Sequence, residues 1–315
     1  MEDFKLTGVL PATFTPMKAN GDVDYDKIDE YCEFLSREGI RQIYVNGSTG
    51  EGPSLTAEER MRLTECWVKY GKKNGRLSKI IIQVGGTCLK DSITMAKHAE
   101  TIGADAISTL PPLYFPVATP QDLVEHVRAV AAAAPTIPMY YYHIPFRSGV
   151  NINMEQFLLA GRDVIPTLRG IKFSDKDLVQ MCACLRTKDA RGRNFNIVFG
   201  SDEQMLGAMA LGADGAIGST YNWMSGTFRR LLTRLDQGDL QAARLEQTRS
   251  QDVVKQVFAF GEKTNGTVST LKVVMSLVGL DLGPVRGPMR ELETKDKEAF
   301  FKALTDLGFM EWRKE

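Results

Sequence analysis

Eight short runs of β-branched and other apolar residues alternate along the chain with stretches of helical length. This alternation constrains the fold more than any single motif, because strands that alternate with helices form parallel sheets covered on both faces. The run over residues 80–84, Ile-Ile-Ile-Gln-Val, is typical of such a strand. The eight predicted strands cover residues 9–15, 42–46, 80–84, 106–110, 139–143, 168–173, 196–199 and 215–218.

The stretches between the strands have the apolar spacing of amphipathic helices. Residues 25–36 carry apolar side chains at i, i+3, i+4 and i+7, which places them on one helix face. Thr56 and Glu59 predict a capping box at the start of a helix over residues 57–70. Further helices are predicted over residues 91–101, 121–133 and 177–186.

After Asn222 the strand signals stop and only helical patterns follow, over residues 223–237, 240–261, 267–278 and 294–307. Eight β/α units in succession predict an α/β protein, a (β/α)8 TIM barrel over residues 1–237. Residues 238–315 then form a C-terminal three-helix extension that packs on the barrel. An open doubly wound sheet remains the alternative, because counting strands does not establish closure.

The charge balance limits the partners of the chain. Lysine plus arginine equals aspartate plus glutamate, at 39 each, which argues against a nucleic acid or an anionic membrane bound by overall charge. We find no signal-peptide pattern and no run of 18 apolar residues. The five cysteines lack metal-site spacing, so we expect reduced thiols in a cytoplasmic protein.

Lys172 is the residue that most suggests chemistry. It lies between Ile171 and Phe173 in an apolar predicted strand, and lysine is rarely buried unless it is paired or functional. At the mouth of a barrel, burial lowers the pKa of a lysine and yields the neutral amine that attacks a carbonyl. A lysine that reaches solvent from an edge strand is the alternative, although a closed barrel has no edge strand.

Two other strand ends carry polar groups at the expected catalytic face. The turn Gly47-Ser48-Thr49-Gly50-Glu51-Gly52 exposes backbone N–H groups and two hydroxyls, as sites for carboxylates or phosphates do, but an ordinary βα turn remains possible. Tyr142 can act as a proton relay if a neighbour assists it, because a free phenol has a pKa of about 10. Tyrosines in strands, however, more often serve packing. We expect His143 to be a satisfied structural residue.

Strand seven ends in Gly200-Ser201-Asp202-Glu203, and strand eight ends in Gly218-Ser219-Thr220. The two adjacent carboxylates suit hydroxyl binding, a metal, or the favoured negative first turn of a helix. No histidine or third carboxylate accompanies them at ligand spacing, so hydroxyl binding is preferred and no metal is expected.

Three motifs together give the chain a family resemblance. Gly47-Ser48-Thr49-Gly50-Glu51, Tyr142 before His143-Ile144-Pro145, and Gly170-Ile171-Lys172 occur in the order and spacing of the N-acetylneuraminate lyase/dihydrodipicolinate synthase superfamily. The resemblance covers nearly the whole chain. It implies class I aldolase chemistry without metal or organic cofactor, with Lys172 as the Schiff-base lysine and Tyr142 as the proton shuttle. It further implies that Ser48 and Thr49 hold the 2-oxo acid carboxylate and that the protein is a homotetramer.

Within the superfamily the chain resembles the lyase branch, most closely its animal members. The resemblance implies cleavage of N-acetylneuraminate, a sialic acid, into pyruvate and N-acetylmannosamine. The polyhydroxyl tail would be bound by residues after strands seven and eight: Gly200, Asp202, Glu203 and Ser219. Ser174 stands where the lyases place a substrate-binding hydroxyl residue after the lysine.

Two departures keep the second substrate open. Arg147 occupies a position that is usually apolar in lyases and arginine in the synthases, and Phe115 stands where bacterial members often have tyrosine, with Tyr114 beside it. Dihydrodipicolinate synthase or a 2-keto-3-deoxy-sugar-acid aldolase is therefore the alternative. A catalytically silent barrel is a further one, which the presence of all three motifs opposes.

Overall fold

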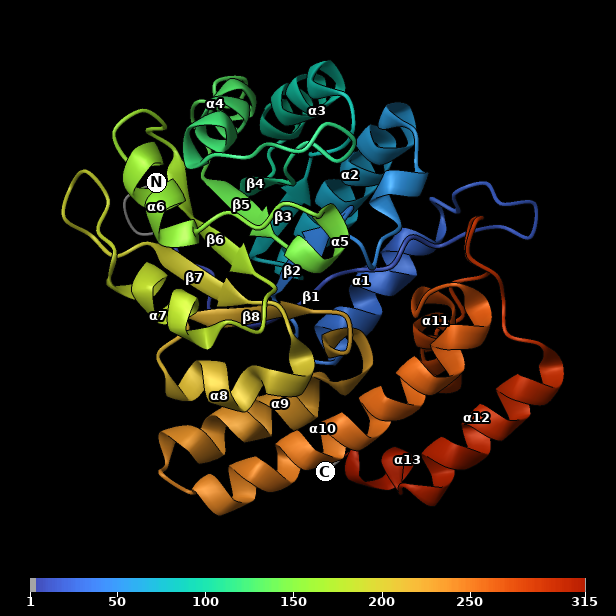
Figure 1. Cartoon of the computed structure of the whole chain (residues 1–315). Helices are drawn as coiled ribbons and strands as arrows, with labels where there is room; N and C mark the ends of the chain where they lie inside the picture. Colours follow the sequence, from blue (N-terminus) through green and yellow to red (C-terminus); the bar gives the residue numbers. More distant parts are fainter. Residues whose placement is uncertain (1–3, 315) are drawn as a thin grey trace.

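The computed structural model describes residues 4–314 and arranges them as eight parallel strands ringed by helices (Figure 1). Hydrogen-bonded neighbours follow the order β1-β8-β7-β6-β5-β4-β3-β2, so the predicted (β/α)8 barrel is confirmed. Four of the strands match the predicted bounds at both ends. The strands are β1 (Gly8–Pro11), β2 (Gln42–Val45), β3 (Lys79–Gln83), β4 (Ala106–Thr109), β5 (Met139–His143), β6 (Leu168–Phe173), β7 (Asn196–Phe199) and β8 (Gly215–Gly218).

The barrel closes where β1 meets β2. β1 ends at Pro11, four residues before the predicted end. The next N–H, of Ala12, donates to Gly218 O of β8 at 2.8 Å, and the N–H of Thr13 donates to Tyr44 O of β2 at 3.0 Å. Because consecutive peptide groups bind two different strands, the sheet curls into a nearly closed ring, and the open-sheet alternative is wrong.

The helices that cover the barrel follow the strands in turn. The capping box at Thr56 and Glu59 is present, with both reciprocal hydrogen bonds formed. Two of these helices, α6 and α8, were not predicted, because eight and six residues are too few for a periodic pattern to stand out. The covering helices are α1 (Lys27–Arg37), α2 (Ala57–Lys72), α3 (Leu89–Thr101), α4 (Pro120–Ala131), α6 (Met154–Gly161), α7 (Leu178–Arg186), α8 (Met205–Ala210) and α9 (Tyr221–Asp236).

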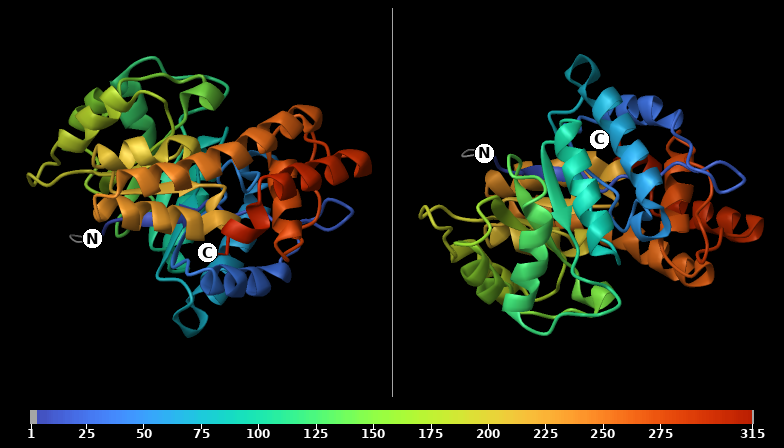
Figure 2. Two further views of the ribbon diagram at one scale, coloured as in Figure 1. Left: turned by 90° about the horizontal axis from the view of Figure 1, so that it is seen from below. Right: turned by 90° about the horizontal axis from the view of Figure 1, so that it is seen from above.

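The C-terminal helices lie against one side of the barrel (Figures 1 and 2). The long α10 runs beside α9, and Arg230 of α9 binds both carboxylate oxygens of Glu246 of α10, at 2.9 and 3.0 Å. A fourth short helix, α13, was not predicted. These helices are α10 (Leu240–Gly261), α11 (Val268–Leu277), α12 (Thr294–Asp306) and α13 (Phe309–Trp312).

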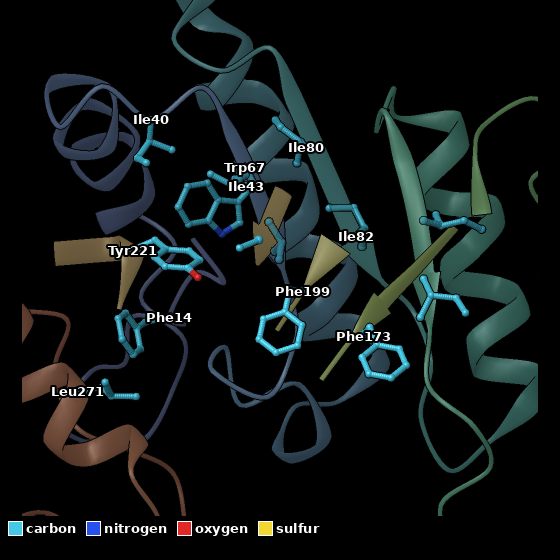
Figure 3. Close-up of a cluster of buried hydrophobic side chains, with 14 of the residues drawn as sticks. Phe14, Ile40, Ile43, Trp67, Ile80, Ile82, Phe173, Phe199, Tyr221 and Leu271 are labelled. Carbon is cyan, nitrogen blue, oxygen red and sulfur yellow. The ribbon is translucent and has the colours of Figure 1, made fainter. Parts of the chain in front are cut away.

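Alternation along the strands separates two layers of packing. Side chains of one parity face the helices, where Ile43, Ile80, Phe173 and Phe199 join a large buried cluster with Trp67 (Figure 3). Side chains of the other parity fill the barrel interior, which includes Tyr44, Ile81, Tyr142 and Val198. Because Ile171 and Phe173 belong to the outer cluster, Lys172 between them must point inward.

Two further features concern the whole described chain. No helix within residues 4–314 is long and apolar enough to cross a membrane. All five cysteines are free thiols.

Candidate active site

Lys172 lies inside the barrel on β6, with only 4% of its surface exposed. Its Nζ atom is 4.0 Å from the centre of the Tyr142 ring and 4.2 Å from that of Tyr44. Within residues 4–314 no carboxylate forms an ion pair with it. A buried amine without an ion-pair partner lacks the counter-ion that accompanies most buried lysines, which favours a functional role.

Two tyrosines form the wall around this amine. Tyr142 is the direct neighbour of Lys172 in the ladder between β5 and β6. Tyr44 of β2 meets Tyr142 edge to face, with ring centres 5.8 Å apart, and its hydroxyl lies 3.1 Å from Ser108 Oγ. Burial holds the pKa of Tyr44 well above its usual value, so this phenol keeps its proton.

The turn after β2 is shaped by close backbone contacts. The N–H of Glu51 donates to Ser48 O at 3.1 Å, and the N–H of Gly52 donates to Gly47 O at 3.1 Å. A side chain at Gly52 would place its Cβ 2.1 Å from Asn46 O, so only glycine fits there. Neither hydroxyl of Ser48 or Thr49 has a hydrogen-bond partner in the described chain, which leaves both available to a bound carboxylate.

Ser174 and Gly200 meet at the ends of β6 and β7. Ser174 is 2% exposed, and its hydroxyl has no partner among residues 4–314. A Cβ on Gly200 would lie 1.8 Å from that hydroxyl. The glycine therefore makes room for the serine, and the pair leaves an unused hydroxyl close to Lys172 in the chain.

Asp202 is the buried acid of the site. It lies in the 3-10 turn η3 (Asp202–Gln204), and its Oδ2 accepts hydrogen bonds from the Thr220 N–H at 2.9 Å and the Thr220 hydroxyl at 2.6 Å. Burial raises the pKa of Asp202 to about 6, against the opposing effect of these two bonds. A Cβ at Gly218 would lie 1.6 Å from Asp202 Oδ1, so β8 must end in glycine to admit the acid.

Glu203 and Ser219 are half-buried beside Asp202 and Thr220. Gln247 and Gln251 of α10 donate side-chain N–H groups to the carbonyls of Asp202 and Glu203, at 3.2 and 2.8 Å. The C-terminal helices thus hold this loop from outside. In the described chain no group of three or more His, Cys, Asp or Glu side chains is arranged to hold a metal ion.

The residues that depart from the lyase pattern lie at the surface. Arg147 is exposed on α5 (Pro145–Ser148), where its guanidinium stacks 5.5 Å from the Phe146 ring centre. Tyr114 and Phe115 are about four-fifths exposed and contact each other edge to face. None of these four side chains is enclosed with Lys172.

His143 is not the satisfied histidine that the sequence suggested. It faces the helices with Tyr141 and Phe173, and neither ring nitrogen makes a hydrogen bond within residues 4–314. Its Nε2 lies 3.5 Å from Asp175 Oδ2. Burial lowers the pKa of His143 to about 4 despite that carboxylate, so the ring is neutral at physiological pH.

Sequence reasoning missed several members of the site. Tyr44 had a visible signal, because Ile43 and Val45 flank it as Ile171 and Phe173 flank Lys172. Gly218 and Thr220 were named only as part of the end of strand eight; their contacts with Asp202 gave no signal, since these depend on how η3 approaches the end of β8. Lys272, which lies behind the Ser48–Thr49 turn, comes from a helix 100 residues beyond Lys172.

Comparisons with known proteins identify the family of the chain. The model of the dihydrodipicolinate synthetase family matches residues 5–307. The rat N-acetylneuraminate lyase is 41% identical over 97% of this chain and 94% of its own length, and the human one is 40% identical over the same shares. The structure of the Proteus mirabilis N-acetylneuraminate lyase superposes with a TM-score of 0.90 at 36% identity, over 97% of this chain and 100% of that one.

Proposed function

The chain belongs to the dihydrodipicolinate synthetase family, and from this premise we propose that it is an N-acetylneuraminate lyase, a class I aldolase that cleaves N-acetylneuraminate reversibly into pyruvate and N-acetylmannosamine. The observation that carries the proposal is the buried amine of Lys172, which faces Tyr142 and has no ion-pair partner in the described chain. The substrate rests on the names of relatives about 40% identical over nearly the full length.

Lys172 begins the reaction. Its amine attacks C2 of the open-chain sugar acid and gives a carbinolamine. The carbinolamine hydroxyl leaves as water with a proton from Tyr142, which leaves a protonated imine and the Tyr142 phenolate. Ser48 and Thr49 bind the adjacent carboxylate, which keeps the carbonyl carbon aligned with Nζ. The imine nitrogen serves as the electron sink, so we propose that the reaction needs no metal or organic cofactor.

Tyr142 assists the bond cleavage. It takes the proton from the C4 hydroxyl, directly or through the substrate carboxylate, while the C3–C4 bond breaks and its electrons move toward the imine. N-acetylmannosamine leaves as the aldehyde. The remaining enamine is protonated at C3, and water hydrolyses the resulting imine to pyruvate and free Lys172.

The far end of the site suits the polyhydroxyl tail. The hydroxyl of Ser174, the carboxylates of Asp202 and Glu203 and the hydroxyl of Ser219 supply hydrogen-bonding groups, and Gly200 supplies space. Two adjacent carboxylates accept several hydrogen bonds from vicinal hydroxyls, a pattern that sugars satisfy and small carboxylated aldehydes do not.

The test measures pyruvate release from N-acetylneuraminate, followed through lactate dehydrogenase and NADH, with Lys172→Ala as the blank. Release by the wild-type chain alone supports the lyase. No release, combined with borohydride trapping of pyruvate on Lys172, would keep the imine chemistry and reject the substrate. In that case aldehydes that carry a carboxylate, the substrates of the alternative aldolases, are tested next.

Assembly and location belong to the same proposal. We propose a homotetramer, as the family resemblance implies, in the cytoplasm. Light scattering after gel filtration measures the first: a mass near four times 35.0 kDa supports it, and a mass near 35.0 kDa rejects it.

A further inference from the structure

Behind the Ser48–Thr49 turn lies a buried ion pair that the proposed chemistry does not use. Glu51 closes the turn, and its Oε1 lies 2.8 Å from Nζ of Lys272 on α11. The two side chains are 0% and 3% exposed. Lys272 also donates to Pro284 O at 2.6 Å, and the backbone N–H of Arg286 donates to Glu51 Oε2 at 2.8 Å. Within residues 4–314, every partner of the Glu51 carboxylate therefore comes from the C-terminal extension.

The backbone of Glu51 shows why the turn needs this support. Glu51 has φ of 56°, the left-handed conformation that residues other than glycine rarely adopt. In that conformation its N–H reaches Ser48 O, and its side chain is fully buried against Lys272. Such a conformation persists only where the surroundings fix it.

A second ion pair extends the support to α2. The Arg286 guanidinium binds both carboxylate oxygens of Glu59, at 2.7 and 2.8 Å, and donates to Ser54 O at 2.9 Å. Glu59 is also the capping-box residue of α2. The segment around Arg286 thus holds the chain on both sides of η1 (Gly52–Ser54), which follows the turn directly.

We propose that Lys272 and Glu51 are positioning residues, through which the C-terminal extension holds the Ser48–Thr49 turn in the shape that binds the substrate carboxylate. The proposal rests on the proposed imine chemistry at Lys172. Neither residue touches the reacting atoms. Their loss should weaken the binding of a 2-oxo acid and leave the amine of Lys172 able to react.

The experiment separates binding from reaction. Pyruvate is trapped on the protein with cyanoborohydride and followed by intact mass, which gives the half-saturating pyruvate concentration and the trapping rate at saturation. In Lys272→Met we expect the former to rise about tenfold, within the range that a 1 Å displacement of a binding group produces. The rate at saturation should stay within about threefold of wild type, because Lys172 is intact.

A matched control comes from the same extension. Lys263 forms an ion pair with Asp296 at 2.6 Å, but its side chain is 52% exposed and its partner belongs to the extension and not to the turn. Lys263→Met should leave both trapping parameters unchanged. General damage to the extension would lower the amount of folded protein without changing the half-saturating concentration.

A rise of less than about threefold in folded Lys272→Met overturns the proposal. Should Lys272→Met not fold, Glu51→Gln decides, because glutamine keeps the shape and an acceptor for Arg286. In Glu51→Gln we expect the half-saturating pyruvate concentration to rise about fivefold, and a rise of less than about twofold overturns the proposal. A wild-type chain that traps no pyruvate would reject the proposed function itself.

Discussion

Within residues 4–314, Lys172 and Lys272 are the two lysines that are almost fully buried, at 4% exposure each, and their surroundings are opposite. Lys272 lies against Glu51 and a backbone carbonyl. Lys172 lies against two tyrosine rings and has no ion-pair partner in the described chain. Burial alone thus does not mark a reactive lysine. The paired lysine has the surroundings of a structural residue, and the unpaired one has those that the proposed covalent chemistry needs.

The largest expected effect comes from the unpaired lysine. Lys172→Met should lower pyruvate release by about 10⁴-fold or more, because it removes the amine that is proposed to form the imine. The same change should leave the free energy of unfolding unchanged or raise it by up to about 1 kcal/mol, since an apolar side chain replaces a buried amine. Activity and urea denaturation of one variant test both. Pyruvate trapping that persists in this variant would rule out Lys172 as the nucleophile.

The paired lysine should behave in the opposite way. Lys272→Met leaves Glu51 buried without its ammonium partner, which should lower the free energy of unfolding by about 3–5 kcal/mol. Replacing both members, Lys272→Met with Glu51→Gln, should recover part of that loss, because no charge is then left unpaired. Urea denaturation without ligand measures this coupling. Additive losses in the double variant would show that the ion pair does not form.

A change at Tyr142 tests the proposed proton shuttle beside Lys172. Tyr142→Phe should lower kcat by about 100-fold, the usual effect of losing an acid–base group, while pyruvate trapping persists. Tyr140→Phe is the matched control, because Tyr140 lies two residues earlier on the same face and its hydroxyl donates to Asn196 Oδ1 at 2.7 Å. Its loss should affect stability and leave kcat within about threefold. Equal kcat losses in both variants would contradict the proton-shuttle role.

Asp202 should make kcat/KM depend on pH. Its pKa of about 6 means that the carboxyl loses its proton between about pH 5 and 7 and then accepts more hydrogen bonds from substrate hydroxyls. The kcat/KM for N-acetylneuraminate should therefore rise with pH through about 6. Asp202→Asn should remove that step and lower kcat/KM at pH 7 by about tenfold. An unchanged pH profile in the variant would exclude Asp202 as its cause.

The same carboxyl should also make the free energy of unfolding depend on pH, and this stability should fall as the pH rises. The folded pKa of Asp202 lies above the unfolded value of about 3.9, so its contribution is fully present below about pH 4 and is lost as pH rises through 6. Relative to wild type, Asp202→Asn should therefore be more stable at pH 7 than at pH 4. Urea midpoints at the two pH values measure this difference.

The sequence predicted the barrel well and its supports poorly, for a physical reason. Strand alternation is local, so the inward direction of Lys172 follows from Ile171 and Phe173 alone. The pairing of Glu51 with Lys272 depends on how α11 packs behind the turn, and 221 positions separate the two residues. The contact between Asp202 and Thr220 likewise depends on the approach of two loops. The groups that are proposed to react can thus be predicted from the sequence, whereas the residues that hold them in place can be found only from the structure.

The smallest effect is expected at Arg147, and it separates the two branches of the family. Arg147 is exposed on α5 and stacks on Phe146, whereas Lys172 and Asp202 are buried. Arg147→Ala should therefore change kcat/KM for N-acetylneuraminate by less than about twofold, because a surface guanidinium contributes little. An arginine that binds the carboxylate of an aldehyde substrate would behave differently, since losing a charge-assisted pair raises KM about tenfold or more. The assay uses a carboxylated aldehyde and pyruvate in the synthetic direction. A tenfold rise in KM there would show that the aldehyde substrate is of the synthase type, and the contrast between Lys172 and Lys272 would remain.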